Sequence, residues 1–337
     1  MQHPHLLAAF WLLALAAPAS AAAAPPPRKP WLSGDVRLPT NPYYGAVKQA
    51  AEWKTTRPAD ASLMEELAKV PGCFWVGGGG DIQAAVKTRL DQCRKQKALP
   101  VFVIYNIPDR DAGQFSKGGE ATAEAYLAWI GRFADAVGAE PAVAIYEPDA
   151  LGQMDHTPEP KRPARYAMIA SAIQALVKSG SIDVYIDAGN CAWLKPPEAA
   201  RRLQLAGVEK ARGFALNVSN FQRTEDTLEY GRKVAALAGG KHFVVDTSRN
   251  GNGPLPKEQD RDGMGWCNPP GRAVGQPPTA KTGEPLCDAF LWIKTPGESD
   301  GAFRGGPASG GWWPEYALEL MRNAAANAPA KPKSGGR

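Results

Sequence analysis

Short hydrophobic runs rich in β-branched and aromatic residues alternate along the chain with longer amphipathic stretches. Seven such runs cover residues 73–77, 101–106, 142–147, 182–187, 213–218, 242–246 and 289–294. Between the runs, apolar residues recur at helical spacing over residues 82–96, 121–137, 165–178, 197–205 and 224–237. Because the runs are too apolar to expose a face to water, they predict strands buried on both sides. The alternation predicts an α/β fold, a distorted, seven-stranded parallel (β/α) barrel of TIM-barrel type.

The N-terminal 21 residues have the pattern of a secretory signal peptide. Residues 6–17 are apolar, and the following Ala19-Ser20-Ala21 fits the small-x-small rule for signal peptidase. An uncleaved membrane anchor is the alternative, although Pro18 and the weakly hydrophobic alanines make a poor membrane span. We therefore predict cleavage after residues 1–21 and a secreted protein, either extracellular or periplasmic.

Beyond this segment the chain divides into a Pro-rich leader (residues 22–39), one folded domain (residues 40–325) and a tail expected to be disordered (residues 326–337). The 39 Lys and Arg against 34 Asp and Glu give a net charge of +5, and the basic residues are scattered rather than clustered. This distribution argues against nucleic acid as a partner. No other stretch approaches the length of a membrane span, and we expect a monomer.

Five cysteines follow the predicted signal peptide, without a Cys-x-x-Cys motif. With only two histidines beside them, this set predicts no metal site. In an exported protein disulfides are the usual state of cysteine, and an odd count leaves at least one unpaired. We predict a bridge between Cys73 and Cys93, because the start of a strand and the end of the next helix both lie at the bottom of a barrel. Cys267 with Cys287 is a weaker candidate pair, which leaves Cys191 free.

Carboxylate residues follow four of the predicted strands. In parallel barrels the loops at the carboxyl ends of the strands carry the chemistry, so these side chains are expected to meet at one rim. Acids beside aromatic platforms suit a carbohydrate site, because sugar faces stack on indole rings and two carboxyl groups cleave the acetal. The acidic residues are Asp109, Asp111, Glu147, Asp149, Asp187, Glu298 and Asp300, and the tryptophans are Trp193, Trp266 and Trp292.

Three other interpretations of this acidic rim are open. A single Asp or Glu at a strand end is commonly a turn former or a helix N-cap, although the joint occurrence is harder to explain in this way. The same carboxylates suit Mg²⁺ or Ca²⁺, but no Asp-x-Asp-x-Asp-Gly loop is present. A Ser-His-Asp hydrolase is disfavoured, because the chain has no Gly-x-Ser-x-Gly elbow and His242 begins a strand at the opposite end from the rim.

Two segments resemble the signature sequences of glycoside hydrolase family 6, the cellobiohydrolases and endoglucanases that act on β-1,4-glucan. The first is Val-Ile-Tyr-Asn-Ile-Pro-Asp-Arg-Asp at residues 103–111, and the second is Tyr-Glu-Pro-Asp-Ala-Leu at residues 146–151. The resemblance implies that residues 40–325 are a catalytic domain, with a barrel of fewer than eight strands and no cofactor. It continues through residues 187–189, 213–220, 246–251, 266–272 and 292–300.

The resemblance also implies roles for individual residues. Asp149 corresponds to the general acid, Asp111 to a carboxylate that raises its pKa and helps to hold a water chain, and Asp300 to a candidate base. Tyr105 corresponds to a residue that crowds the reacting sugar. The residues placed along the sugar-binding cleft are Asp187, Asn190, Trp193, Asn217, Trp266, Lys294, Glu298 and Ser116, the last on a loop that covers the reacting subsite.

Three positions depart from the family pattern. Ala112 and Ala302 stand where the family has cysteines, so its two usual disulfides are absent, and Asn190 replaces a histidine that contacts sugar. We predict a secreted, inverting endo-β-1,4-glucanase of cellulose and related β-1,4-glucans, because the chain leaves little room for the loops that roof the exo-acting members. The alternatives are an exo-acting cellobiohydrolase and a non-catalytic carbohydrate-binding protein of the same fold.

Overall fold

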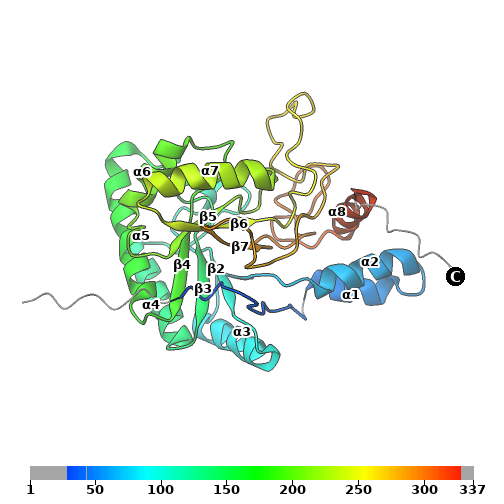
Figure 1. Ribbon diagram of the computed structural model, residues 1–337, viewed down its shortest axis with the longest axis horizontal. Helices are drawn as coiled ribbons and strands as arrows, with labels where there is room; N and C mark the ends of the chain where they lie inside the picture. Colours follow the sequence, from blue (N-terminus) through cyan, green and yellow to red (C-terminus); the bar gives the residue numbers. More distant parts are fainter. Residues whose placement is uncertain (1–28, 43, 328–337) are drawn as a thin grey trace, which may run out of the picture.

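Seven parallel strands form one curled sheet, a half-barrel, in the computed structural model, which describes residues 29–42 and 44–327 (Figure 1). The strands pair in sequence order, and among the described residues β1 pairs only with β2 and β7 only with β6. The predicted α/β architecture is confirmed, with the barrel open rather than closed. The strands are β1 (Phe74–Val76), β2 (Val101–Ile104), β3 (Ala142–Tyr146), β4 (Ile182–Asp187), β5 (Gly213–Leu216), β6 (His242–Asp246) and β7 (Cys287–Leu291).

The strand bounds follow the hydrophobic runs except at β7, which begins and ends earlier than the run at residues 289–294. Pairing with β6 stops where Asp246 lies opposite Leu291. Beyond that point the Asp246 carboxylate accepts hydrogen bonds from the backbone amides of Ile293 (3.3 Å) and Lys294 (3.0 Å). The last apolar residues of the run are therefore buried by packing and are tied to β6 by a side chain instead of a strand ladder.

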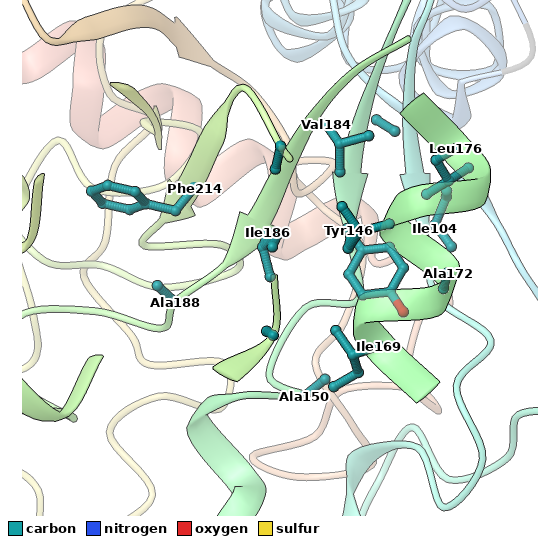
Figure 2. Close-up of a cluster of buried hydrophobic side chains, with 14 of the residues drawn as sticks. Ile104, Tyr146, Ala150, Ile169, Ala172, Leu176, Val184, Ile186, Ala188 and Phe214 are labelled. Atoms are coloured by element: carbon teal, nitrogen blue, oxygen red, sulfur yellow. The ribbon is translucent and has the colours of Figure 1, made fainter. Parts of the chain in front are cut away.

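Strand side chains alternate between two hydrophobic layers, which explains why the runs are apolar at every position. In β2, Val101 and Val103 belong to the layer inside the half-barrel, while Phe102 and Ile104 belong to the layer between the sheet and the helices. Figure 2 shows part of this outer layer, where strand residues meet α5 (Arg162–Val177). The strand side chains labelled there are Ile104, Tyr146, Val184, Ile186 and Phe214, and those of α5 are Ile169, Ala172 and Leu176.

The helices predicted between the strands cover the outside of the sheet, and each lies within a few residues of its expected bounds (Figure 1). Asp81 caps α3 by accepting from the amides of Gln83 (2.9 Å) and Ala84 (3.3 Å). Thr122 accepts from the amide of Ala125 (3.2 Å), so α4 begins two residues later than expected. Besides α5 these helices are α3 (Ile82–Gln96), α4 (Ala123–Val137), α6 (Pro196–Leu205) and α7 (Thr224–Leu237).

Three further helices, which the sequence pattern did not predict, pack together beyond the edge of the sheet: α1 (Gly45–Trp53), α2 (Pro58–Lys69) and α8 (Pro314–Asn327) (Figure 1). They bury Trp292, just after β7. The indole Nε1 of Trp75 in β1 donates to the carbonyl of Ile293 (2.8 Å), which links the two edges of the half-barrel. Because α8 extends to Asn327, the last described residue, residues 326 and 327 of the tail expected to be disordered are helical.

Residues 31–38, which belong to the predicted Pro-rich leader, close the bottom of the half-barrel. Leu32 and Leu38 are buried in the inner layer. The backbone amide of Trp31 donates to Asp183 (2.8 Å) and its indole donates to the carbonyl of Ser181 (2.7 Å), at the start of β4. The predicted signal peptide lies outside the described residues, and none of the helices within them is long and apolar enough to cross a membrane.

All five cysteines lie in the described part of the chain, and all are free thiols, so both predicted bridges are wrong. Cys73 packs against the inner layer, whereas Cys93 is buried in the outer layer, and the sheet separates them. Cys287 begins β7 at the bottom of the half-barrel. Cys267 lies at the opposite end, next to Asn268, whose amide binds Asp300.

We therefore expect five titratable thiols per chain in denatured, unreduced protein, with no increase after prior reduction. In the native protein these thiols should react slowly, because burial raises the pKa of Cys93 and of Cys267 to about 12. Titration with an aromatic disulfide reagent measures the number of thiols in the denatured protein and their rate of reaction in the native protein. Three thiols or one thiol before reduction would show that the chain carries disulfides.

Candidate active site

Asp149 lies just after β3, at the carboxyl rim of the sheet. Its backbone adopts the left-handed conformation (φ 70°), which costs energy in a residue other than glycine and marks a position held by its surroundings. Its amide donates to the Asp187 carboxylate (2.9 Å), which also accepts from the amide of Gly189 (3.2 Å). Asp187 ends β4 and is 1% exposed. It therefore supports Asp149 from beneath.

Asp111 lies on the loop after β2, residues 110–118, which we call the lid loop. Both of its carboxylate oxygens accept hydrogen bonds, one from the backbone amide of Ser116 (2.7 Å) and one from Nε2 of Gln153 (2.9 Å). The Arg110 guanidinium donates to the carbonyls of Tyr105 (2.7 Å) and Ser116 (2.7 Å) and lies 4.6 Å from the Tyr105 ring centre. These contacts fix the lid loop to the end of β2.

Asp300 lies on the opposite side of the rim, in the segment that follows β7. The fully buried Arg249 donates to both of its oxygens (2.9 Å each), and the amide of Asn268 donates to one of them (3.1 Å). The Lys294 ammonium is 3.7 Å from the other oxygen. Two cationic side chains therefore flank the Asp300 carboxylate, and Arg249 occupies both of its oxygens.

The rim is arranged to keep a proton on Asp149. Burial raises the pKa of the Asp149 carboxyl well above its usual range, and the neighbouring Asp187, Asp111 and Asp300 carboxylates raise it further. The Lys294 cation acts in the opposite direction. Burial also raises the pKa of Asp187 to about 7, against the effect of the two backbone amides that donate to it. Asp149 can thus enter a reaction as a protonated acid at neutral pH.

Glu147, two residues before Asp149, is a second buried carboxyl group. It accepts hydrogen bonds from the amide of Asn106 (3.0 Å) and from the hydroxyl of Tyr126 (2.8 Å). Burial raises its pKa to about 7. Because it faces the interior rather than the rim, it holds the end of β2 beside the end of β3.

The rim opens into a cleft of about 940 Å³. Three large aromatic side chains on its walls stay exposed to solvent, Phe115 and Trp193 at 40% and Trp266 at 37%, and the two indoles suit stacking on sugars. Two glycines make room for the Trp193 ring: a Cβ on Gly152 would lie 2.5 Å from it, and one on Gly189 would lie 3.1 Å from it.

The lid loop crosses the cleft and touches its opposite wall. The Phe115 ring packs so closely on Gly301 that a Cβ there would lie 2.4 Å from it, and its centre is 6.0 Å from that of Trp266. The hydroxyl groups of Ser116 and Ser309 are 2.6 Å apart. The cleft is therefore covered at the level of Asp111.

Ten of the twelve predicted site residues line this cleft, and Asp187 and Asn217 do not. Asn217 is completely buried, and its amide group donates to the carbonyl of Asp246 (2.9 Å) and accepts from the amide of Gln222 (3.1 Å). It shapes the loop after β5 and has no face toward a sugar, so its prediction as a substrate contact is wrong. The ten are Tyr105, Asp111, Ser116, Asp149, Asn190, Trp193, Trp266, Lys294, Glu298 and Asp300.

Sequence reasoning missed four residues that shape the cleft. Gln153 lies four residues after the predicted Asp149, and Phe115 lies next to the predicted Ser116, but only the folded chain shows them reaching a second loop. Arg249 and Asn268 lie within segments that carried the family resemblance, but only the folded chain shows that they bind Asp300. Within the described residues, no cluster of His, Cys, Asp and Glu is arranged to hold a metal ion.

A buried carboxyl group with a raised pKa beside other carboxyl groups, in an aromatic cleft at the carboxyl end of a parallel sheet, is the arrangement expected of a glycoside hydrolase. The model of the family described as glycosyl hydrolases family 6 matches residues 33–324. The chain therefore belongs to glycosyl hydrolases family 6.

Individual relatives agree with this assignment. The chain is 42% identical over 275 residues to Endoglucanase A of Cellulomonas fimi, a match covering 81% of this chain and 58% of that protein. It is 39% identical to Endoglucanase 1 of Streptomyces sp. (strain KSM-9), over 86% of this chain and 80% of the relative. The structure of the endoglucanase Cel6 from Mycobacterium tuberculosis, in complex with a thio-linked cello-oligosaccharide, superimposes with a TM-score of 0.81 at 38% identity, covering 87% of this chain and 99% of that one. The chain thus spans little more than half the length of the Cellulomonas relative.

Proposed function

We propose that this protein is an exported endoglucanase that hydrolyses β-1,4-glucan with inversion at the anomeric carbon. The observation that carries the proposal is the position of Asp149, a carboxyl group held protonated by burial and by three neighbouring carboxylates in an aromatic cleft. The two curated relatives described above are named endoglucanases, which supports the same substrate class. The retained acid also argues against a protein that only binds sugar.

The proposed reaction moves one proton in and one proton out. Asp149 donates its proton to the glycosidic oxygen as the bond from that oxygen to the anomeric carbon breaks. A water molecule attacks the same carbon from the opposite face, and its proton leaves through neighbouring water toward a carboxylate at the rim. The Asp111 carboxylate lies beside Asp149 and helps to hold that water. The products are two shorter glucans, and Asp149 regains a proton from solvent.

Asp300 is a weak candidate for the carboxylate that receives this proton directly. Arg249 binds both of its oxygens and Lys294 lies close by, so accepting a proton would leave two buried cations without a counter-charge. We infer that Asp300 acts mainly by holding the positive side chains at the rim, and that the proton passes along a water chain.

Sugar units of the glucan are expected along the cleft, with their apolar faces on Trp193 and Trp266. Lys294 and Glu298, which line the reacting region, are suited to hydrogen-bond sugar hydroxyls, as are Asn190 and Ser116. Tyr105 borders the same region, with its ring held by Trp75 (ring centres 5.3 Å apart) and by Arg110. It can therefore restrict the conformation of the reacting sugar.

Endo action predicts that the viscosity of a soluble cellulose derivative falls early relative to the reducing ends released. The physical reason is that a cut in the middle of a chain halves its length, whereas a cut at an end removes only one small unit. Viscometry and a reducing-sugar assay on the same samples measure the ratio. The lid loop that crosses the cleft gives the exo alternative a structural basis, so release of cellobiose at nearly constant viscosity would favour a cellobiohydrolase.

A further inference from the structure

Gln153 joins the segment that carries the acid to the loop that carries the neighbouring carboxylate. It lies four residues after Asp149, lines the cleft and is partly buried. Its Nε2 donates to one oxygen of Asp111 (2.9 Å), and the other oxygen accepts from the backbone amide of Ser116 (2.7 Å). Gln153 is thus the side chain that ties Asp111 to the end of β3.

Gln153 is itself held in place by the turn that contains it. Its backbone amide donates to the carbonyl of Asp149 (2.8 Å). The buried Arg202 donates to the carbonyls of Leu151 (2.7 Å) and Gly152 (3.1 Å), the two residues that precede Gln153. A side chain on a turn fixed in this way can position a partner on a neighbouring loop.

The backbone at Asp111 is strained. Asp111 and the next residue, Ala112, both have left-handed conformations (φ 57° and 47°), which cost energy in residues other than glycine and are held by surrounding contacts. The amide nitrogen of Gln153 donates to one oxygen of Asp111, so this hydrogen bond fixes the direction of the Asp111 carboxylate on the lid loop.

We propose that Gln153 is a positioning residue, whose amide holds the Asp111 carboxylate beside the acid and so sets the upper pH limit of hydrolysis. This inference rests on the proposed roles of Asp149 and Asp111. The charged and titratable groups that face Asp149 are Asp187 of β4, Asp111 of the lid loop, Lys294 and Asp300 after β7, and Tyr105 after β2. Of these, Asp111 is the one whose orientation Gln153 controls.

The alkaline limb of the pH profile depends on the proton that Asp149 carries. Asp149 must be protonated to act, so activity is lost as pH rises through its pKa. Without the Gln153 amide, the Asp111 carboxylate can turn away from Asp149, and this change weakens the repulsion that keeps the proton on Asp149. The alkaline limb of the profile of kcat/KM against pH should therefore move to lower pH in Gln153→Met, by about 0.5–1 unit.

A double-mutant comparison separates this positioning role from a merely structural one. Gln153→Met should shift the alkaline limb in the otherwise unchanged protein and produce no further shift when Asp111→Asn is already present. Gln153→Ala gives a second, smaller side chain, and Gln174→Met, on an exposed position of α5, is the matched control that should leave the profile unchanged. Thermal melts establish that each variant is folded.

An unchanged limb in folded Gln153→Met and Gln153→Ala would overturn the inference, as would an equal shift in the Asp111→Asn background. Either result would leave the proposed function intact, provided that replacing Asp149 still abolishes hydrolysis of cellulose. If the Asp149 variant instead kept its activity, the proposed function itself would be wrong. The two failures are therefore distinguishable.

Discussion

Replacing Asp149 by asparagine should lower the rate of hydrolysis of cellulose by about 10²–10⁴-fold, because the leaving oxygen of an unactivated glucan needs a proton. Asparagine is the sharpest substitution, since it preserves the volume and tolerates the left-handed backbone that Asp149 adopts. It cannot act as a carboxylic acid. On a cellobioside with a good phenolate leaving group, which departs without a proton, the same variant should lose far less activity.

The control for this variant is Asp135→Asn, a change of the same type on an exposed position of α4. It should leave both substrates unaffected. Equal losses on the two substrates in Asp149→Asn would indicate a disturbed cleft rather than a missing acid. Near-normal turnover of cellulose would remove Asp149 from the mechanism altogether.

Replacing Arg249 by methionine should lower the free energy of unfolding by about 3–5 kcal/mol, because it leaves the Asp300 carboxylate buried with one of its two cations gone. Arg249 also donates to the carbonyl of Ser219 and lies 4.5 Å from the Phe221 ring centre, so it joins three loops at the rim. Urea unfolding followed by tryptophan fluorescence measures the change.

Two comparisons identify the cause of this loss. Adding Asp300→Asn to Arg249→Met removes the uncompensated charge and should recover part of the lost stability. Arg94→Met breaks an exposed ion pair with Glu140 and should change the unfolding midpoint little. If Arg249→Met were as stable as Arg94→Met, the ion pair at Asp300 would not organise the rim.

The parts of the fold that depend on local pattern could be predicted from the sequence. Buried parallel strands are apolar at every position, so β4 and β6 were found at their observed bounds. The end of β7 could not be found in this way, because the apolar Trp292 and Ile293 are buried by α1, α2, α8 and the inner layer rather than by strand pairing. The missing bridges have a similar origin, since Cys73 and Cys93 are near in sequence but on opposite faces of the sheet.

At the site, resemblance located the acids at the rim but did not show which oxygens were occupied. Asp300 was expected as a base, and its pairing with Arg249 depends on residues 51 positions apart. Asn217 was expected in the cleft, yet its side chain turns inward to the carbonyl of Asp246. Such details arise from contacts between loops that follow different strands, and a linear pattern carries no information on them.

In the proposed reaction, water replaces the leaving group directly, without a covalent intermediate on the protein. Proton NMR during the first minutes of hydrolysis of a cello-oligosaccharide separates the two anomers of the new reducing end before they interconvert. With inversion, the α-anomer should appear first and the β-anomer should grow in later by mutarotation. If the β-anomer appeared first, hydrolysis would proceed by a retaining mechanism and the proposed reaction would be wrong.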